Sequence, residues 1–161
     1  MKKLLTVASA LLALFIFNGC DDEPDYRDDL VGTYTGYVEY SETDGEQKDD
    51  GTYASELIVS KGSSDNTLNI RIKDKYGVEH LFYAEKLKEV GNEFVFKMRT
   101  VNDGGTVYCG LEELYKILGQ QSKDELIDCV FDIESNKMIF DFSVVDAEEE
   151  YLCMYLFDGR K

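Results

Sequence analysis

Side chains that could carry chemistry are few and scattered in this 161-residue sequence. His80 is the only histidine, and its neighbour Glu79 and the surrounding residues offer no catalytic-triad arrangement. Cys109, Cys129 and Cys153 are separated by twenty and twenty-four residues, a spacing that matches no zinc-binding pattern. We therefore predict no catalytic residue, no metal site and no cofactor, and we interpret the protein as a non-enzyme.

The three cysteines have a second interpretation, which depends on where they lie in the fold. Cys129 and Cys153 fall in apolar strand-like runs, where cysteine commonly behaves as a small hydrophobic residue. We predict buried thiols at these positions. One disulfide that includes Cys109 stays open as an alternative, because thiols form disulfides in an oxidising compartment.

Tyrosine is the residue type that suggests a binding function. The chain contains 11 tyrosines and 9 phenylalanines but no tryptophan, and a tyrosine side chain combines an apolar ring with a polar tip. We predict that four of them line a ligand pocket: Tyr37, Tyr53, Tyr83 and Tyr155. The alternative is a barrel that its own side chains fill.

The first twenty residues have the organisation of an export signal that ends at a cysteine. Lys2 and Lys3 precede an uncharged, mostly apolar run, and Gly19 and Cys20 close the stretch. It resembles the signal peptide of bacterial lipoproteins, in which the cysteine receives fatty acyl chains, although Phe17 occupies a place that usually holds leucine. The resemblance implies a signal peptide over 1–19 and lipid attachment at Cys20.

The acidic run after Cys20 predicts a solvated tether over residues 20–29, followed by one domain over 30–161. The formal net charge is -16, and -18 without the two leader lysines, so binding to nucleic acid is excluded on electrostatic grounds. We expect a lipid-anchored protein of the cell envelope, at the outer membrane or cell surface, with the inner membrane left open. The acidic stretches 44–50 and 146–150 lack the spacing of a calcium loop and suggest solvated loops or a surface for a basic partner.

Short alternating runs of apolar and polar residues, separated by turn signals, predict eight or nine antiparallel strands. The first is expected over 30–40, and a polar hairpin loop over 41–50 leads to the second over 52–60. Helical spacing of leucines over 111–118 predicts one helix, late in the chain.

The last part of the chain predicts a hairpin between strands over 126–133 and 138–145. A tight turn at Ser135–Asn136 would place Phe131 opposite Phe140 and Cys129 opposite Phe142. The same pattern predicts that Asp128, Asp132 and Asp141 point to the other, wet face. The many strands and single helix predict an all-β, antiparallel, up-and-down barrel, because closure removes exposed strand edges.

The opening residues Gly32-Thr33-Tyr34 resemble the glycine–x–tryptophan motif of calycin and lipocalin barrels, with tyrosine in place of tryptophan. The run Leu-Val-Gly-Thr-Tyr-Thr-Gly from Leu30 is similar to calycin-like lipoproteins of Gram-negative bacteria. The resemblance implies a calycin-like barrel, closed where Arg160 packs on the ring of Tyr34, and it implies binding of a small apolar or amphipathic ligand. The alternative function is a filled barrel whose acidic loops contact another cell-envelope protein.

Overall fold

The computed structural model describes residues 25–121, 126–146 and 151–161, which form an antiparallel β-structure with one α-helix late in the chain. This confirms the predicted all-β barrel. A short 3-10 helix, η1 (Tyr26–Asp29), comes before the sheet, and α2 (Leu111–Ile117) lies near the predicted position. The strands are β1 (Gly32–Asp44), β2 (Gln47–Lys61), β3 (Thr67–Lys73), β4 (Glu79–Val90), β5 (Glu93–Arg99), β6 (Val101–Asp103), β7 (Thr106–Cys109), β8 (Cys129–Asp132), β9 (Lys137–Asp146) and β10 (Tyr151–Arg160).

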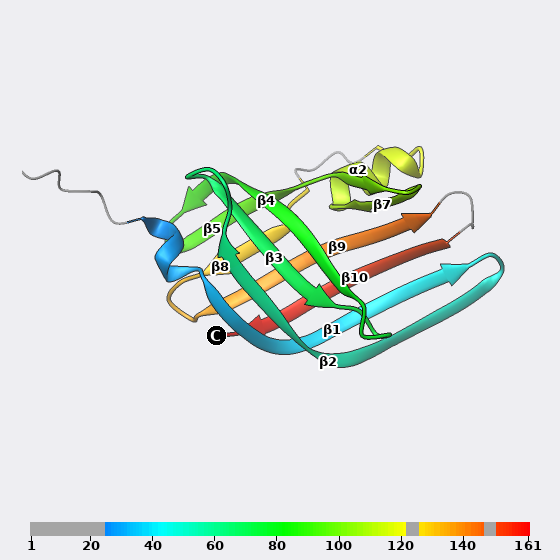
Figure 1. Ribbon diagram of the computed structural model, residues 1–161, viewed down its shortest axis with the longest axis horizontal. Coiled ribbons are helices and arrows are strands. Elements are labelled where there is room, and N and C mark those ends of the chain that lie inside the picture. Colours follow the sequence, from blue (N-terminus) through cyan, green and yellow to red (C-terminus); the bar gives the residue numbers. More distant parts are fainter. Residues whose placement is uncertain (1–24, 122–125, 147–150) are drawn as a thin grey trace, which may run out of the picture.

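Eight of these strands close into a ring in the order β1-β2-β3-β4-β5-β8-β9-β10, and β10 returns to β1 along ten paired residues (Figure 1). The β6–β7 hairpin attaches to the second half of β9, beyond Phe140, the last β9 residue that pairs with β8. At the closure, Gly36 is opposite Gly159, and a Cβ atom on Gly36 would lie 2.1 Å from the Asp158 carbonyl oxygen. Only glycine permits this close approach of the two strands.

Alternation along the strands sends one set of side chains into the ring and the other set to the outside. In β3, for example, Leu68, Ile70 and Ile72 are buried while Arg71 is exposed. Side chains from all eight ring strands form one core, whose largest fully buried rings are Phe82, Phe96, Phe131, Phe140, Phe142 and Phe157. The alternation of apolar and polar residues over 68–73 in the sequence therefore corresponds to one buried and one solvent-facing side of β3.

The predicted loop over 41–50 is wrong, because both strands continue through it as a long hairpin. β1 runs to Asp44 and β2 starts at Gln47, leaving a two-residue turn of Gly45 and Glu46. Gly45 has a φ of 56°, a conformation that glycine adopts without the steric penalty of other residues. A polar composition does not prevent a segment from forming a strand when its backbone can pair with neighbouring strands. Here residues 41–44 pair with β10 on one side and with β2 on the other.

The predicted register of the β8–β9 hairpin is also wrong, by two residues. Phe131 is opposite Met138, and Cys129 is opposite Phe140. The Asp132 carboxylate accepts hydrogen bonds from the Glu134 backbone nitrogen and the Ser135 hydroxyl, at 3.0 and 2.6 Å, and so fixes a four-residue loop. A shift of two keeps the same side chains inside, since successive side chains alternate between the faces.

Asp128 does not point to the wet face as predicted, because its carboxylate serves as a buried structural acceptor. Its oxygens accept hydrogen bonds from the backbone nitrogens of Leu111 and Met98, at 2.7 and 2.8 Å. The side chain thereby satisfies a free N–H in the first turn of α2, whose N-cap residue Gly110 cannot do so. Burial raises the pKa of Asp128, and the two backbone hydrogen bonds act in the opposite direction.

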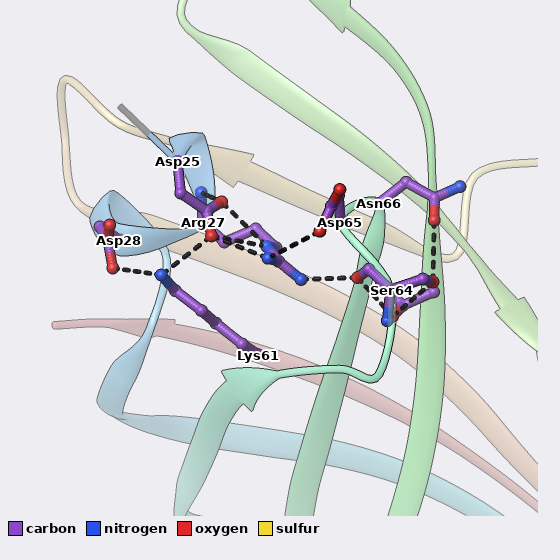
Figure 2. Close-up of polar contacts among 8 residues, drawn as sticks. Asp25, Arg27, Asp28, Lys61, Ser64, Asp65 and Asn66 are labelled. Carbon is purple, nitrogen blue, oxygen red and sulfur yellow. Dashed lines mark hydrogen bonds and ion pairs between the residues drawn. The ribbon is translucent and has the colours of Figure 1, made fainter. Parts of the chain in front are cut away.

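The end of the barrel where β1 begins, called the proximal end from here on, is closed by the N-terminal segment. Leu30 is buried in the core, and the ring of Tyr26 stacks on Phe94 with their centroids 5.1 Å apart. Figure 2 shows the polar contacts that hold η1 there: the Arg27 guanidinium bonds the Asp25 carboxylate and the Ser64 carbonyl of the β2–β3 loop. Lys61 adds ion pairs to Asp25 and Asp28. These contacts, called the clasp, hold η1 against the proximal end of the barrel.

Candidate binding surface at the distal end of the barrel

The interior of the barrel contains stacked aromatic rings. Phe142 stacks on Tyr155 and on Phe140, with centroid separations of 4.5 and 5.1 Å, and Phe82 lies 4.9 Å from Phe142. Each of these four side chains is at most 3% exposed. Close-packed rings in these geometries stabilise a core and occupy the centre that an eight-stranded barrel would offer to a ligand.

The distal end, opposite the clasp, is closed by Lys75 from the β3–β4 turn. Its ammonium lies 4.4 Å above the ring of Tyr40 and pairs with the carboxylates of Glu42 and Asp49. The Tyr76 hydroxyl donates to Glu42 at 3.0 Å. Burial lowers the pKa of Lys75, but the bonds to Asp49 and Glu42 outweigh that effect and leave the pKa above its usual range. The turn is thus held against the inner face of the β1–β2 hairpin.

His80 lies beside this turn and has a structural role. Its Nε2 is 3.0 Å from Asp74 Oδ2, and its ring lies 5.4 Å from that of Tyr108. The other oxygen of Asp74 accepts hydrogen bonds from the backbone nitrogens of Tyr76 and Val78, so the carboxylate organises the β3–β4 turn. This arrangement ties the β4 strand to the turn.

Beyond Lys75, the β1–β2 hairpin forms an acidic arm, defined here as residues 39–56. It contains seven acidic residues and one basic residue, Lys48. Residues 44–50 are exposed at every position, so both faces of the tip lie in solvent. Figure 1 shows the tip extending away from η1, at the far end of the molecule. A concentration of negative charge of this kind attracts cationic groups and repels anionic ones.

A groove runs where β2 separates from β3. Pairing between these strands ends at Leu57 and Ile72, although β2 continues for ten residues before Leu57. Past that point the Tyr53 and Ser55 hydroxyls reach the Lys73 carbonyl oxygen, at 3.1 and 3.4 Å, in place of a backbone ladder. The groove has a volume of about 900 Å³, is open to solvent, and is lined by both apolar and charged side chains, among them Tyr37, Ala54, Glu56, Ile58 and Lys73.

The four tyrosines predicted to share a ligand pocket do not converge. Tyr37 and Tyr53 line the β2–β3 groove, and Tyr37 is 64% exposed. Tyr83 lies in a smaller groove on the outer face of β3, β4 and β5, while Tyr155 is buried in the aromatic core. The alternation of residues along a strand could not predict these three locations. It indicates which side chains of one strand share a face, but not which strands lie next to one another in the barrel.

The residues predicted to close the barrel lie near one another, but without the expected stacking. Arg160 is opposite Thr35, and both are exposed on the outer face. Tyr34 points into the core, where its ring meets Phe131 and its hydroxyl donates to the Leu30 carbonyl at 2.8 Å. A Cβ atom on Gly32 would lie 3.2 Å from the Lys161 side chain. Tyr34 and Thr35 are consecutive in β1, so their side chains face opposite sides of the barrel wall, and Arg160 shares the outer side with Thr35. Closure therefore comes from the backbone ladder between β1 and β10.

The cysteines in the described part of the chain, Cys109, Cys129 and Cys153, are buried free thiols. Burial raises the pKa of Cys109 and of Cys153 to about 11, and it raises that of Cys129 well above its usual range. The prediction of buried thiols is confirmed, and the thiolate form needed for reaction is disfavoured. Cys20 and the signal region lie outside the described residues.

The arm, the Lys75 contacts and the groove together form the surface that the sequence missed. The seven acidic residues of the arm form a charge cluster in the sequence, but the polar composition of 41–50 predicts a loop where the structure has two paired strands. No local signal marks where β2 parts from β3, because that depends on how both strands pack. Within residues 25–121, 126–146 and 151–161, no three His, Cys, Asp or Glu side chains gather as a metal-binding group.

No helix among the described residues has the length and apolar character required to cross a membrane. No protein-family model matches the chain, and no curated protein matches its sequence.

Proposed function

We propose that this protein is an exported, lipid-anchored, non-enzymatic interaction module that binds another cell-envelope protein through the acidic arm and the adjoining groove. The single observation that carries the proposal is the closed interior. Phe82, Phe140, Phe142 and Tyr155 fill the centre, and the clasp and Lys75 close the two ends. A barrel whose interior is filled can bind a partner only through its outer surface. The exposed, charged arm is the most distinctive part of that surface.

The clasp supports a definite orientation for this module. Cys20, the proposed lipid attachment point, precedes Asp25 by five residues, and five residues span at most about 18 Å. Asp25 is bonded to Arg27 and Lys61 at the proximal end. A lipid on Cys20 would therefore keep the proximal end near the bilayer and direct the arm away from it. This fits an outer-membrane or cell-surface protein that reaches a neighbour.

The family assignment remains part of the proposal. The eight-strand ring and the Gly32-Thr33-Tyr34 opening support a calycin-like lipoprotein. Against that, Arg160 lies outside the barrel wall, so the expected contact with the tyrosine ring is missing. Such barrels differ widely in function, and the surface therefore carries more weight than the fold.

Site-specific photocrosslinking in intact cells tests the interaction. A photoreactive residue at exposed Thr52, in the arm, should give one discrete adduct that contains a cell-envelope protein. The matched position is exposed Glu93 on β5, at the proximal end, where no such adduct is expected. Equal yields of the same adduct from both positions, or none from several positions across the arm, would contradict the proposal.

A second candidate function is supported by the groove itself. Tyr37 and Tyr53 line it together with Ile58, so that an amphipathic small molecule would find aromatic surface beside charged groups. Mass spectrometry of small molecules that co-purify with the native protein tests this. A molecule whose yield falls in Tyr53→Ala but not in Tyr83→Ala would favour ligand binding over the protein interaction.

A further inference from the structure

The acidic arm contains the longest stretch of strand that pairs on one side only among the described strands. β2 pairs with β1 from Gln47 to Lys61, but with β3 only from Leu57 to Lys61. The ten residues Gln47–Glu56 thus have one partner strand, whereas β10 is paired on both sides along its whole length. A strand with one partner presents unpaired backbone N–H and C=O groups along its free edge, which can template another strand.

The surroundings of this edge leave room for an added strand. From Gln47 to Asp50 the side chains are exposed on both faces, and the β2–β3 groove continues the opening toward Glu56. Neighbouring strands in a sheet lie about 4.8 Å apart, and the β2–β3 ladder ends at Leu57, so no strand is paired to this edge before that residue. The Tyr53 and Ser55 hydroxyls mark the point at which the gap narrows to side-chain reach.

We propose that the partner binds as an extended segment rich in lysine or arginine, which adds to the free edge of β2 as a further strand. This inference rests on the proposed function and specifies its partner. Backbone hydrogen bonds along Gln47–Thr52, before the contacts of Tyr53 and Ser55 with Lys73, supply the pairing, and alternate side chains of the segment meet the groove or the solvent. The seven acidic residues of the arm give the complementary charge for a basic segment and speed its association.

Charge also selects against a second copy of the chain as the occupant. Pairing two arms edge to edge would bring two strongly acidic segments together, and charged edges of this kind prevent strand association between identical molecules. A basic segment from another protein removes that repulsion. The same charge pattern would therefore block self-association and admit the partner.

Peptide binding to the purified, isotope-labelled full chain tests strand addition directly. The probe is a capped ten-residue peptide of alternating lysine and valine. Two further versions carry N-methyl groups on the odd or on the even amides, and a fourth has glutamate in place of lysine. We expect the basic peptide to slow hydrogen exchange at amides within residues 47–56. A strand pairs along one edge, so one N-methylated peptide should bind at least tenfold more weakly than the other.

A matched pair of protein variants localises the charge effect. Glu56→Gln lies beside the groove and should weaken binding of the lysine peptide severalfold, whereas Glu93→Gln, at an exposed position of β5, should leave it unchanged. Equal weakening of both N-methylated peptides, or none of either, would overturn strand addition, as would equal binding of the glutamate peptide. If crosslinking from Thr52 still captures an envelope protein in that case, the proposed function survives and only the mode of binding is wrong.

Discussion

Tyr34 and Arg160 lie on the adjacent strands β1 and β10 but on opposite faces of the barrel wall, Tyr34 in the core and Arg160 in solvent. The two strands are joined by their backbone ladder, so the side chains need no contact for the barrel to close. The chain therefore lacks the packing of an arginine on an aromatic ring that the resemblance to calycin barrels implies. It also leads to a measurable prediction.

A double-mutant cycle on Tyr34→Leu and Arg160→Met should give a coupling energy within about 0.5 kcal/mol of zero, because the groups do not touch. Tyr34→Phe alone should lower the free energy of unfolding by about 1 kcal/mol, since the buried hydroxyl donates to the Leu30 carbonyl. Denaturant unfolding measures both quantities. A coupling above 1 kcal/mol would mean that the side chains meet in solution.

Phe140→Ala should lower the free energy of unfolding by about 3–5 kcal/mol, because the ring is fully buried between Phe82 and Phe142 and leaves a cavity. The matched control is Ile139→Ala, one residue earlier on the outer face and 36% exposed, which should cost about 1 kcal/mol or less. Similar losses at the two positions would show that the β9 faces are misassigned.

Asp141 makes stability depend on pH in the mildly acidic range. Burial, with a smaller contribution from Asp128, raises the pKa of Asp141 from 3.8 to about 6. A carboxyl whose pKa is higher in the folded state favours folding most at low pH, and that contribution is lost as pH rises from about 4 through 6. Relative to the wild type, Asp141→Asn should gain about 1 kcal/mol between pH 4 and pH 7, allowing for the partial exposure of the carboxyl.

Denaturant unfolding of the wild type and Asp141→Asn at both pH values isolates this contribution from that of other carboxylates. Glu112, for example, has a pKa lowered to about 2 by Lys97 and Lys116, and it acts in the opposite direction in both proteins. A stability difference that does not change with pH would show that Asp141 titrates normally.

The clasp should govern local opening of the proximal end. Arg27→Met removes the bonds to Asp25 and to the Ser64 carbonyl, so amide hydrogen exchange over residues 26–31 should accelerate at least tenfold. Arg71→Met, which loses only an exposed ion pair to Glu79, provides the control and should leave those amides unchanged. Exchange rates that stay the same in Arg27→Met would show that Leu30 and Tyr26 alone hold the segment.

Cys20→Ala should move the protein from the membrane fraction to the soluble fraction, because the acidic surface has no attraction for anionic lipids. Asp22→Asn, which retains the cysteine, should stay with the membranes. Fractionation with a salt wash, followed by immunodetection, measures the distribution. If Cys20→Ala still sediments with the membranes after the wash, the proposed lipid attachment at Cys20 is wrong.

The sequence alone determined which side chains of the regular strands face inward. Leu68, Ile70 and Ile72 alternate with polar residues, and the two-residue repeat of a strand converts that pattern into a buried and a wet face. The helix over residues 111–118 could be predicted for the same kind of reason, since its leucines recur at helical spacing. Local periodicity was sufficient in both cases.

Only the tertiary structure decided where strands stop pairing and which polar groups are buried. Asp128 was turned inward by backbone N–H groups of Leu111 and Met98, which are seventeen and thirty residues away in the chain. Tyr155 joined the core while Tyr37 remained outside, and β2 parted from β3 before Leu57. These outcomes depend on the packing of all eight ring strands at once, and no short stretch of sequence contains that information.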